Sequence, residues 1–137
     1  MQQNTAWQRN LKAAAGICML AAMLFLLTGC GKGSAFEGSS VSNASGFWME
    51  YSVLNQEESA DLNLKKDERL QVDLSHADGY VDVTVGIEGQ EPIYRGNGQQ
   101  NAAFLLEIAE TGKYHIAVSG YHAKGSASFT RISGDQD

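Results

Sequence analysis

The stretch GYVDVTVGI, residues 79–87, decides the fold class, because apolar side chains occupy every second position along it. A period of two places one face of a strand on a core and leaves the other face in water. The same alternation recurs in the segments 62–65, 70–75 and 113–119. We therefore predict an all-β fold for residues 47–137, an antiparallel β-sandwich of seven or eight strands without a helix.

Turn signals between the alternating segments predict two hairpins. The Asp78-Gly79 pair lies between the segments 70–75 and 81–87, and Asp-Gly strongly favours a hairpin turn. Loops of two and of four residues both keep apolar residues opposite one another, so the turn type stays open. A second hairpin is expected around residues 120–123, between two further strand segments.

The first residues have the pattern of a targeting signal. Residues 1–12 are polar and carry Arg9 and Lys12, and residues 13–27 form an uninterrupted apolar run. This run is shorter than the roughly 20 residues that a membrane-spanning helix needs, and it suits the core of a signal peptide. Residues 1–29 are therefore expected to be a cleaved leader.

The apolar run ends in Leu27-Thr28-Gly29-Cys30, which is similar to the lipobox of bacterial lipoproteins. The resemblance implies that a diacylglycerol alkylates the Cys30 thiol and that cleavage before Cys30 makes it the new N-terminus. Two or three acyl chains would hold the protein stably on a membrane. The alternative is an uncleaved anchor that happens to contain a cysteine.

Lipidation would place the protein on the extracytoplasmic face of the cell membrane. Cys18 would leave with the leader, so the mature chain would keep no free thiol and form no disulfide. Gly31 is not the aspartate that retains lipoproteins at the inner membrane of Gram-negative cells. A Gram-positive surface is favoured over a Gram-negative outer membrane.

A tether is expected between the lipid and the folded body. The stretch from Cys30 to Gly46 is rich in glycine and serine, a composition that builds no core and behaves as a flexible coil. The predicted organisation is a signal peptide at 1–29, a lipidated cysteine with its tether at 30–46, and a sandwich domain at 47–137.

The charge of the chain argues against a nucleic-acid partner. The formal net charge is −6, and residues 30–137 alone carry eight basic and sixteen acidic residues, a net charge of −8. Such a body has no basic stripe that could displace counterions from phosphates.

One segment of the body resembles a known family. Residues 110–120, ETGKYHIAVSG, look like the Gly-x-Tyr-x-(Ile/Leu)-x-Val-x-Gly strand of bacterial pre-peptidase C-terminal domains, and residues 68–74 and 79–85 are similar to two other strands of that family. The family's Asp-x-Asp-x-(Tyr/Phe) opening is replaced by EYSVL at residues 50–54, so no metal site carries over. The resemblance implies that the predicted sandwich is jelly-roll-like and that it is a non-catalytic accessory module.

The sequence offers no recognisable catalytic set, cofactor motif or nucleophile elbow, and we do not expect an enzyme. His76, His115 and His122 are expected at separate surface positions. Calcium is the one metal with candidate ligands, because the hairpin would bring acidic side chains of two strands together. These candidates are Asp73, Asp78 and Asp82.

Aromatic residues give the one positive indication of binding. If Phe47, Met49 and Tyr51 face the core, Trp48 and Glu50 face outward, and an indole beside an acid suits stacking against a sugar. Alternatively, Trp48 packs on the sandwich edge. Two further aromatic residues, Tyr94 and Tyr121, could extend such a platform.

The function expected from these features is a membrane-anchored surface lipoprotein whose sandwich is a protein-interaction or accessory module. A carbohydrate- or cell-wall-binding module that uses Trp48, Glu50 and Tyr121 is the alternative.

Overall fold

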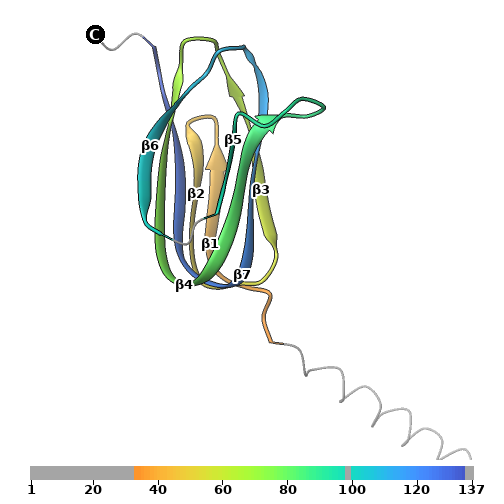
Figure 1. Cartoon of the computed structure of the whole chain (residues 1–137), viewed down its shortest axis with the longest axis vertical. Coiled ribbons are helices and arrows are strands. Elements are labelled where there is room, and N and C mark those ends of the chain that lie inside the picture. Colours follow the sequence, from red (N-terminus) through yellow and green to blue (C-terminus); the bar gives the residue numbers. More distant parts are fainter. Residues whose placement is uncertain (1–32, 98–99, 135–137) are drawn as a thin grey trace, which may run out of the picture. The chain divides into compact units, whose positions relative to one another are not determined.

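The computed structural model describes residues 33–97 and 100–134, so the predicted leader and Cys30 lie outside the described residues. Within these ranges the chain is all-β, as predicted, with seven strands (Figure 1). The strands are β1 (Phe36–Asn43), β2 (Gly46–Leu54), β3 (Glu57–Leu64), β4 (Arg69–Ile87), β5 (Tyr94–Asn97), β6 (Ala102–Glu107) and β7 (Gly112–Ile132). None of the described segments forms a helix long and apolar enough to cross a membrane.

Two long strands organise the fold. β4 has 19 residues and β7 has 21, and they pair antiparallel from Arg69 opposite Ile132 to Ile87 opposite Tyr114. Figure 1 shows both strands running down one side of the domain, turning together at the lower end of the view and returning on the other side. The two-stranded ribbon is therefore folded over upon itself.

This folded ribbon is shared by two half-sheets. One half has the order β1-β2-β7-β4-β6, and the other has the order β3-β7-β4-β5. Every pair is antiparallel, and the two halves face one another across the core, so the predicted antiparallel sandwich-like fold is confirmed.

Both predicted hairpins are wrong. The segments on either side of Asp78-Gly79 are one continuous strand, and so are the segments on either side of residues 120–123. Leu74 pairs with Ala127 on β7 and not with a residue of β4. The turn signal marks a bend because a glycine at positive φ serves a β-bulge as well as a hairpin turn.

The bend is built from backbone irregularities on both long strands. The register between them shifts on either side of Asp78. Gly79 has a φ of 68° and His122 a φ of 46°. A Cβ atom at Gly79 would lie 2.2 Å from the carbonyl oxygen of His122, so only glycine fits there.

The core fills the space between the half-sheets. Phe47, Met49 and Tyr51 face inward, which is one of the two orientations that the sequence leaves open. An irregularity in the pairing of β2 with β7 makes Leu54 the next fully buried residue. The rings of Phe47 and Phe129 stack with centroids 6.0 Å apart. The other large, fully buried side chains are Leu62, Leu64, Leu70, Val72, Val83, Val85, Ile108, Tyr114 and Ile116.

The domain begins before residue 47, which corrects the predicted tether. Residues 36–43 form β1, which pairs with β2 from Phe36 opposite Leu54 to Asn43 opposite Gly46. Its side chains are exposed apart from Phe36, which packs against the core. Composition misled the prediction because an edge strand is held by backbone hydrogen bonds, which serine and glycine form as well as apolar residues do.

An ion pair closes the end of the domain opposite the bend. The buried Glu68 carboxylate accepts hydrogen bonds from Arg131 Nη2, at 2.5 Å, and from the Lys65 backbone N–H, at 2.7 Å. Burial alone would raise the pKa of Glu68, but these donors outweigh burial and lower it. Glu68 therefore stays ionised and joins the β3–β4 turn to β7.

We expect Gly79→Ala to lower the free energy of unfolding by about 3 kcal/mol, because a Cβ atom would strain the backbone and collide with His122. Gly89→Ala is the matched control, since Gly89 also has a positive φ, 82°, but has open space where its Cβ would lie. The control should cost about 1 kcal/mol. Equilibrium unfolding in urea measures both, and equal losses would contradict the role given to the bend.

Candidate functional site

Trp48 lies on the outer face of the five-stranded half-sheet in a fixed orientation. Its Nε1–H donates a hydrogen bond of 3.0 Å to Thr130 Oγ1 on β7. Its ring covers Gly46, where an added Cβ would lie 2.7 Å from the indole. The half-buried indole is therefore held on the surface of the sheet, so Trp48 adopts the outward one of the two orientations that the sequence leaves open.

The surroundings of Trp48 are small and mostly polar. Its register partners are Val41 on β1, which is 56% exposed, and Ser128 on β7. Glu50 is exposed two positions further along β2. A shallow depression of about 280 Å³ runs between these residues, which is an open surface and not an enclosed pocket.

The other predicted aromatic residues do not join Trp48. Tyr121 lies at the bend, seven positions along β7 from Ser128, or about 20 Å at the rise of a strand. Tyr94 packs against Phe104 with ring centroids 4.8 Å apart and contacts the core. An extended aromatic platform is therefore not formed, and Trp48 stands alone on its face.

The calcium candidates are not brought together either. Asp73, Asp78 and Asp82 are spread along one continuous strand, because the hairpin that was to juxtapose them does not exist. The Asp78 carboxylate accepts a hydrogen bond from the Gly79 N–H at 2.9 Å. Across the described ranges, no three His, Cys, Asp or Glu side chains are grouped to hold a metal ion.

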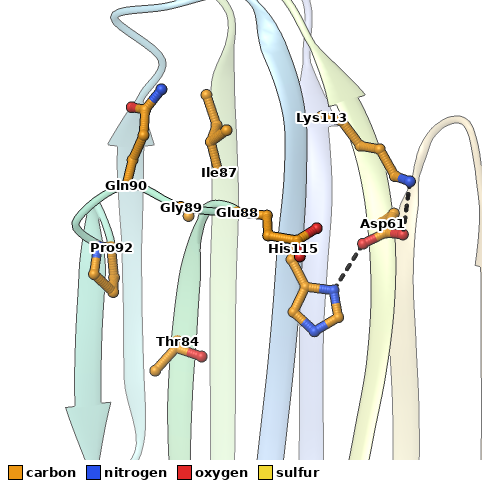
Figure 2. A pocket seen from close by; sticks show the side chains of 10 residues that line it. Asp61, Thr84, Ile87, Glu88, Gly89, Gln90, Pro92, Lys113 and His115 are labelled. Carbon is orange, nitrogen blue, oxygen red and sulfur yellow. Dashed lines mark hydrogen bonds and ion pairs between the residues drawn. The ribbon is translucent and has the colours of Figure 1, made fainter.

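A pocket that the sequence did not reveal lies on the outer face of the four-stranded half-sheet. Figure 2 shows it between β3, the first part of β7 and the loop that follows β4. Its volume is about 520 Å³, within the range of small-molecule sites. The residues that line it are Asp61, Thr84, Gly86, Ile87, Glu88, Gly89, Gln90, Pro92, Lys113 and His115.

The loop at residues 88–92 forms one wall of this pocket. The Gln90 N–H bonds to the carbonyl of Ile87 at 3.1 Å, and the Ile93 N–H bonds to that of Val85 at 2.8 Å, so the loop folds back over β4. Pro92 lies so close to Gly86 that a Cβ there would come within 2.8 Å of its Cα. Gly86 is the register partner of His115, and its lack of a side chain lets Pro92 pack closely against β4.

A carboxylate with two cationic or polar neighbours lies at the mouth of the pocket. Asp61 Oδ1 lies 2.7 Å from His115 Nδ1, and Asp61 Oδ2 lies 3.3 Å from Lys113 Nζ (Figure 2). The hydrogen bond with His115 is the largest cause that lowers the pKa of Asp61, and Lys113 adds to it against a smaller effect of burial. Asp61 is therefore a persistent anion.

The Asp61–His115 pair supplies two of the three groups of a nucleophilic triad, an imidazole and the carboxylate that orients it. Within the described part of the chain no hydroxyl or thiol hydrogen-bonds His115. His76 and His122 lie elsewhere, with their backbone N–H groups bonded to Asn101 and Asn55.

Sequence reasoning missed the pair because it depends on register. Asp61 and His115 are 54 positions apart and meet only because β3 pairs with β7. Their outward positions in alternating strands are a signal that each side chain is exposed, but not that they are neighbours.

Comparisons with known proteins name no family. No protein family matches the sequence, and no curated protein matches it. A solved structure, the CENP-C cumin domain of Drosophila melanogaster, is similar at 10% identity over 69% of this chain and 72% of that one, with a TM-score of 0.29. A TM-score this low carries no argument about fold or function.

We expect His115→Gln to raise the pKa of Asp61 toward that of an ordinary aspartate, because it removes the strongest hydrogen bond to the charged form. Lys113→Met should raise it less. A titration of the Asp61 carboxyl carbon by NMR measures both, with Lys124→Met, at the bend, as a control that leaves this titration unchanged. An unchanged pKa in His115→Gln would contradict the geometry of the pair.

Proposed function

We propose that this protein is a lipid-anchored lipoprotein of the bacterial cell envelope whose sandwich is a non-catalytic, protein-binding accessory module. The membrane attachment rests on Leu27-Thr28-Gly29-Cys30 and the apolar run before it. The anchor would lie on the extracytoplasmic face, with a Gram-positive surface as the favoured setting.

The observation that carries the protein-binding part is the free edge of β1. This strand pairs with β2 on one side, and its other side pairs with no strand of the described residues. Its sequence, FEGSSVSN, contains one charge and no proline or lysine. Edge strands that avoid self-association normally carry such residues or a β-bulge, and β1 has an irregularity only near its start, between Glu37 and Gly38. The regular stretch from Ser39 onward therefore favours addition of a partner's strand.

The other long edge strand is different in chemistry. β3 has Glu57, Glu58 and Asp61 along its eight residues, and these acids would disfavour strand addition. The two edges therefore provide a matched comparison within the same domain.

We expect Ser39→Lys on β1 to abolish capture of a stoichiometric partner, because it places a charge on the edge where a strand would add. Ser59→Lys on β3 is the control, since both serines are exposed on edge strands. Crosslinking in cells, affinity capture and mass spectrometry measure the recovery, and the intact mass of the same sample reports lipid on Cys30. Recovery that survives Ser39→Lys, or an absent partner, would contradict strand addition at β1.

A second candidate function, binding of cell-wall carbohydrate, is favoured by the fixed orientation of Trp48. An indole held flat on a sheet by Gly46 and Thr130 is ordered before binding, so it loses little entropy when a sugar ring stacks on it.

For this candidate, Trp48→Ala should weaken binding to purified peptidoglycan about tenfold, the loss expected for one aromatic contact. Trp48→Phe should keep most of the affinity, because a smaller aromatic face remains. Sedimentation with insoluble peptidoglycan gives the bound fraction. Equal binding by wild type and Trp48→Ala would refute a sugar platform at this residue.

A further inference from the structure

The bend exposes a cluster of aromatic side chains that the functions above do not use. Tyr80 and Tyr121 are 39% and 57% exposed, and their rings stack with centroids 5.2 Å apart. The His122 ring meets Tyr121 edge-on, with centroids 4.7 Å apart. We call Tyr80, Tyr121 and His122 the bend cluster.

The irregular backbone is what turns these rings outward. Tyr80 and Tyr121 are register partners just beyond the shifts in pairing at Asp78, and Gly79 and His122 adopt positive φ beside them. Val81, the next residue of β4, is buried in the core. The fold therefore places two large amphipathic rings on the tip of the bend.

The chain enters the domain at this same end. The Ala35 carbonyl accepts a hydrogen bond of 2.7 Å from the Asn55 N–H. The Asn55 side chain in turn accepts one of 2.6 Å from the His122 N–H. Figure 1 shows the start of the described chain at the end where β4 and β7 turn. Asn55 thus links Ala35, where the chain enters the domain, to His122 of the bend cluster.

The proposed lipid at Cys30 would hold this end close to a membrane. Ala35 follows Cys30 by five residues, and a fully extended chain of that length spans at most about 17 Å. The body is longer, since the nine residues of β2 alone span about 30 Å. The bend is therefore the end of the domain that a short attachment brings to the bilayer surface.

We propose that the bend cluster is a membrane-contacting surface in which Tyr80 and Tyr121 insert into the headgroup zone of the bilayer that carries the Cys30 lipid. This inference rests on the lipidation in the proposed function. Tyrosine suits that zone because its ring is apolar and its hydroxyl can stay hydrated.

The charge and the small area of the bend cluster favour a bilayer over a protein as the surface that it contacts. The charged register partners Asp78 and Lys124 have opposite signs, so their charges cancel at the tip itself. The next exposed acids, Glu57 and Asp82, lie beside Ser119, further along the strands. Two tyrosines are too small a patch for a stable protein interface, which buries about 800 Å² on each side. They suffice for an anchored domain, because the lipid keeps their local concentration at the surface high.

Spin labels at the two ends of the domain test the proposal. Ala77→Cys lies at the bend and Ala44→Cys in the β1–β2 turn at the opposite end, and both alanines are exposed. In the lipidated protein the introduced cysteine is the one free thiol, because Cys18 has left and Cys30 is blocked. The full-length, processed protein is reconstituted into phosphatidylcholine vesicles that contain a nickel-chelating lipid.

We expect nickel at the headgroups to enhance relaxation of the label at residue 77 and to affect the label at residue 44 far less. The double variant Tyr80→Ser, Tyr121→Ser should weaken the enhancement at residue 77 to what the short attachment alone produces, with an unchanged circular dichroism spectrum. Equal relaxation at the two positions, or an enhancement at residue 77 that is undiminished in the double variant, would overturn the proposal. Dipolar broadening between labels at residue 77 of two molecules would show that the bend cluster contacts a second copy of the chain. That result would also overturn the proposal.

The intact mass of the reconstituted protein separates the membrane contact of the bend cluster from the proposed lipid attachment at Cys30. Lipid on Cys30 without a difference between the labels would overturn the membrane contact and leave the proposed lipoprotein intact. A mass without lipid would overturn both.

Discussion

The backbone hydrogen bonds between β4 and β7 continue from one half-sheet through the bend into the other, and every other strand of the domain pairs with this ribbon directly or through β2. The two half-sheets that enclose the core are therefore linked through the backbone, since β4 and β7 each run through both. Leu70 and Val72 on one side and Val83 and Val85 on the other come from the same strand. Packing between the half-sheets depends on the angle of one bend.

This arrangement concentrates strain at one end of the domain and stabilisation at the other. The bend requires positive φ at Gly79 and His122, which costs free energy that core packing must offset. The opposite end is closed by the buried pair of Glu68 and Arg131, which fixes the turn after β3 against the end of β7. Breaking such a pair is costly because it leaves a buried charge without a partner.

The same architecture separates the candidate binding surfaces. The outer face of the larger half-sheet carries Trp48, and the outer face of the smaller one carries the Asp61–His115 pair. The free edge of β1 borders the Trp48 depression, which Ser39 and Val41 help to line, and lies apart from the Asp61–His115 pocket. The bend cluster occupies the end where the chain enters. A short attachment at that end would leave both faces and the β1 edge accessible to partners.

The sequence by itself determined the all-β class and the inward faces of the clearly alternating strands, because alternation is a local property that burial on one side imposes. It left two orientations open for the strand that carries Trp48, because that segment is apolar on both faces in part. It does not determine which strands pair, so the local signals at Asp78-Gly79 and at residues 36–43 favour a hairpin turn and a tether. Glycine at positive φ satisfies a hairpin turn and a bulge equally, and serine pairs along a sheet edge as readily as it forms a coil. Only the tertiary pairing of β4 with β7 and of β1 with β2 decided between these alternatives. The neighbours in space, Asp61 with His115 and Tyr80 with Tyr121, follow from that pairing alone.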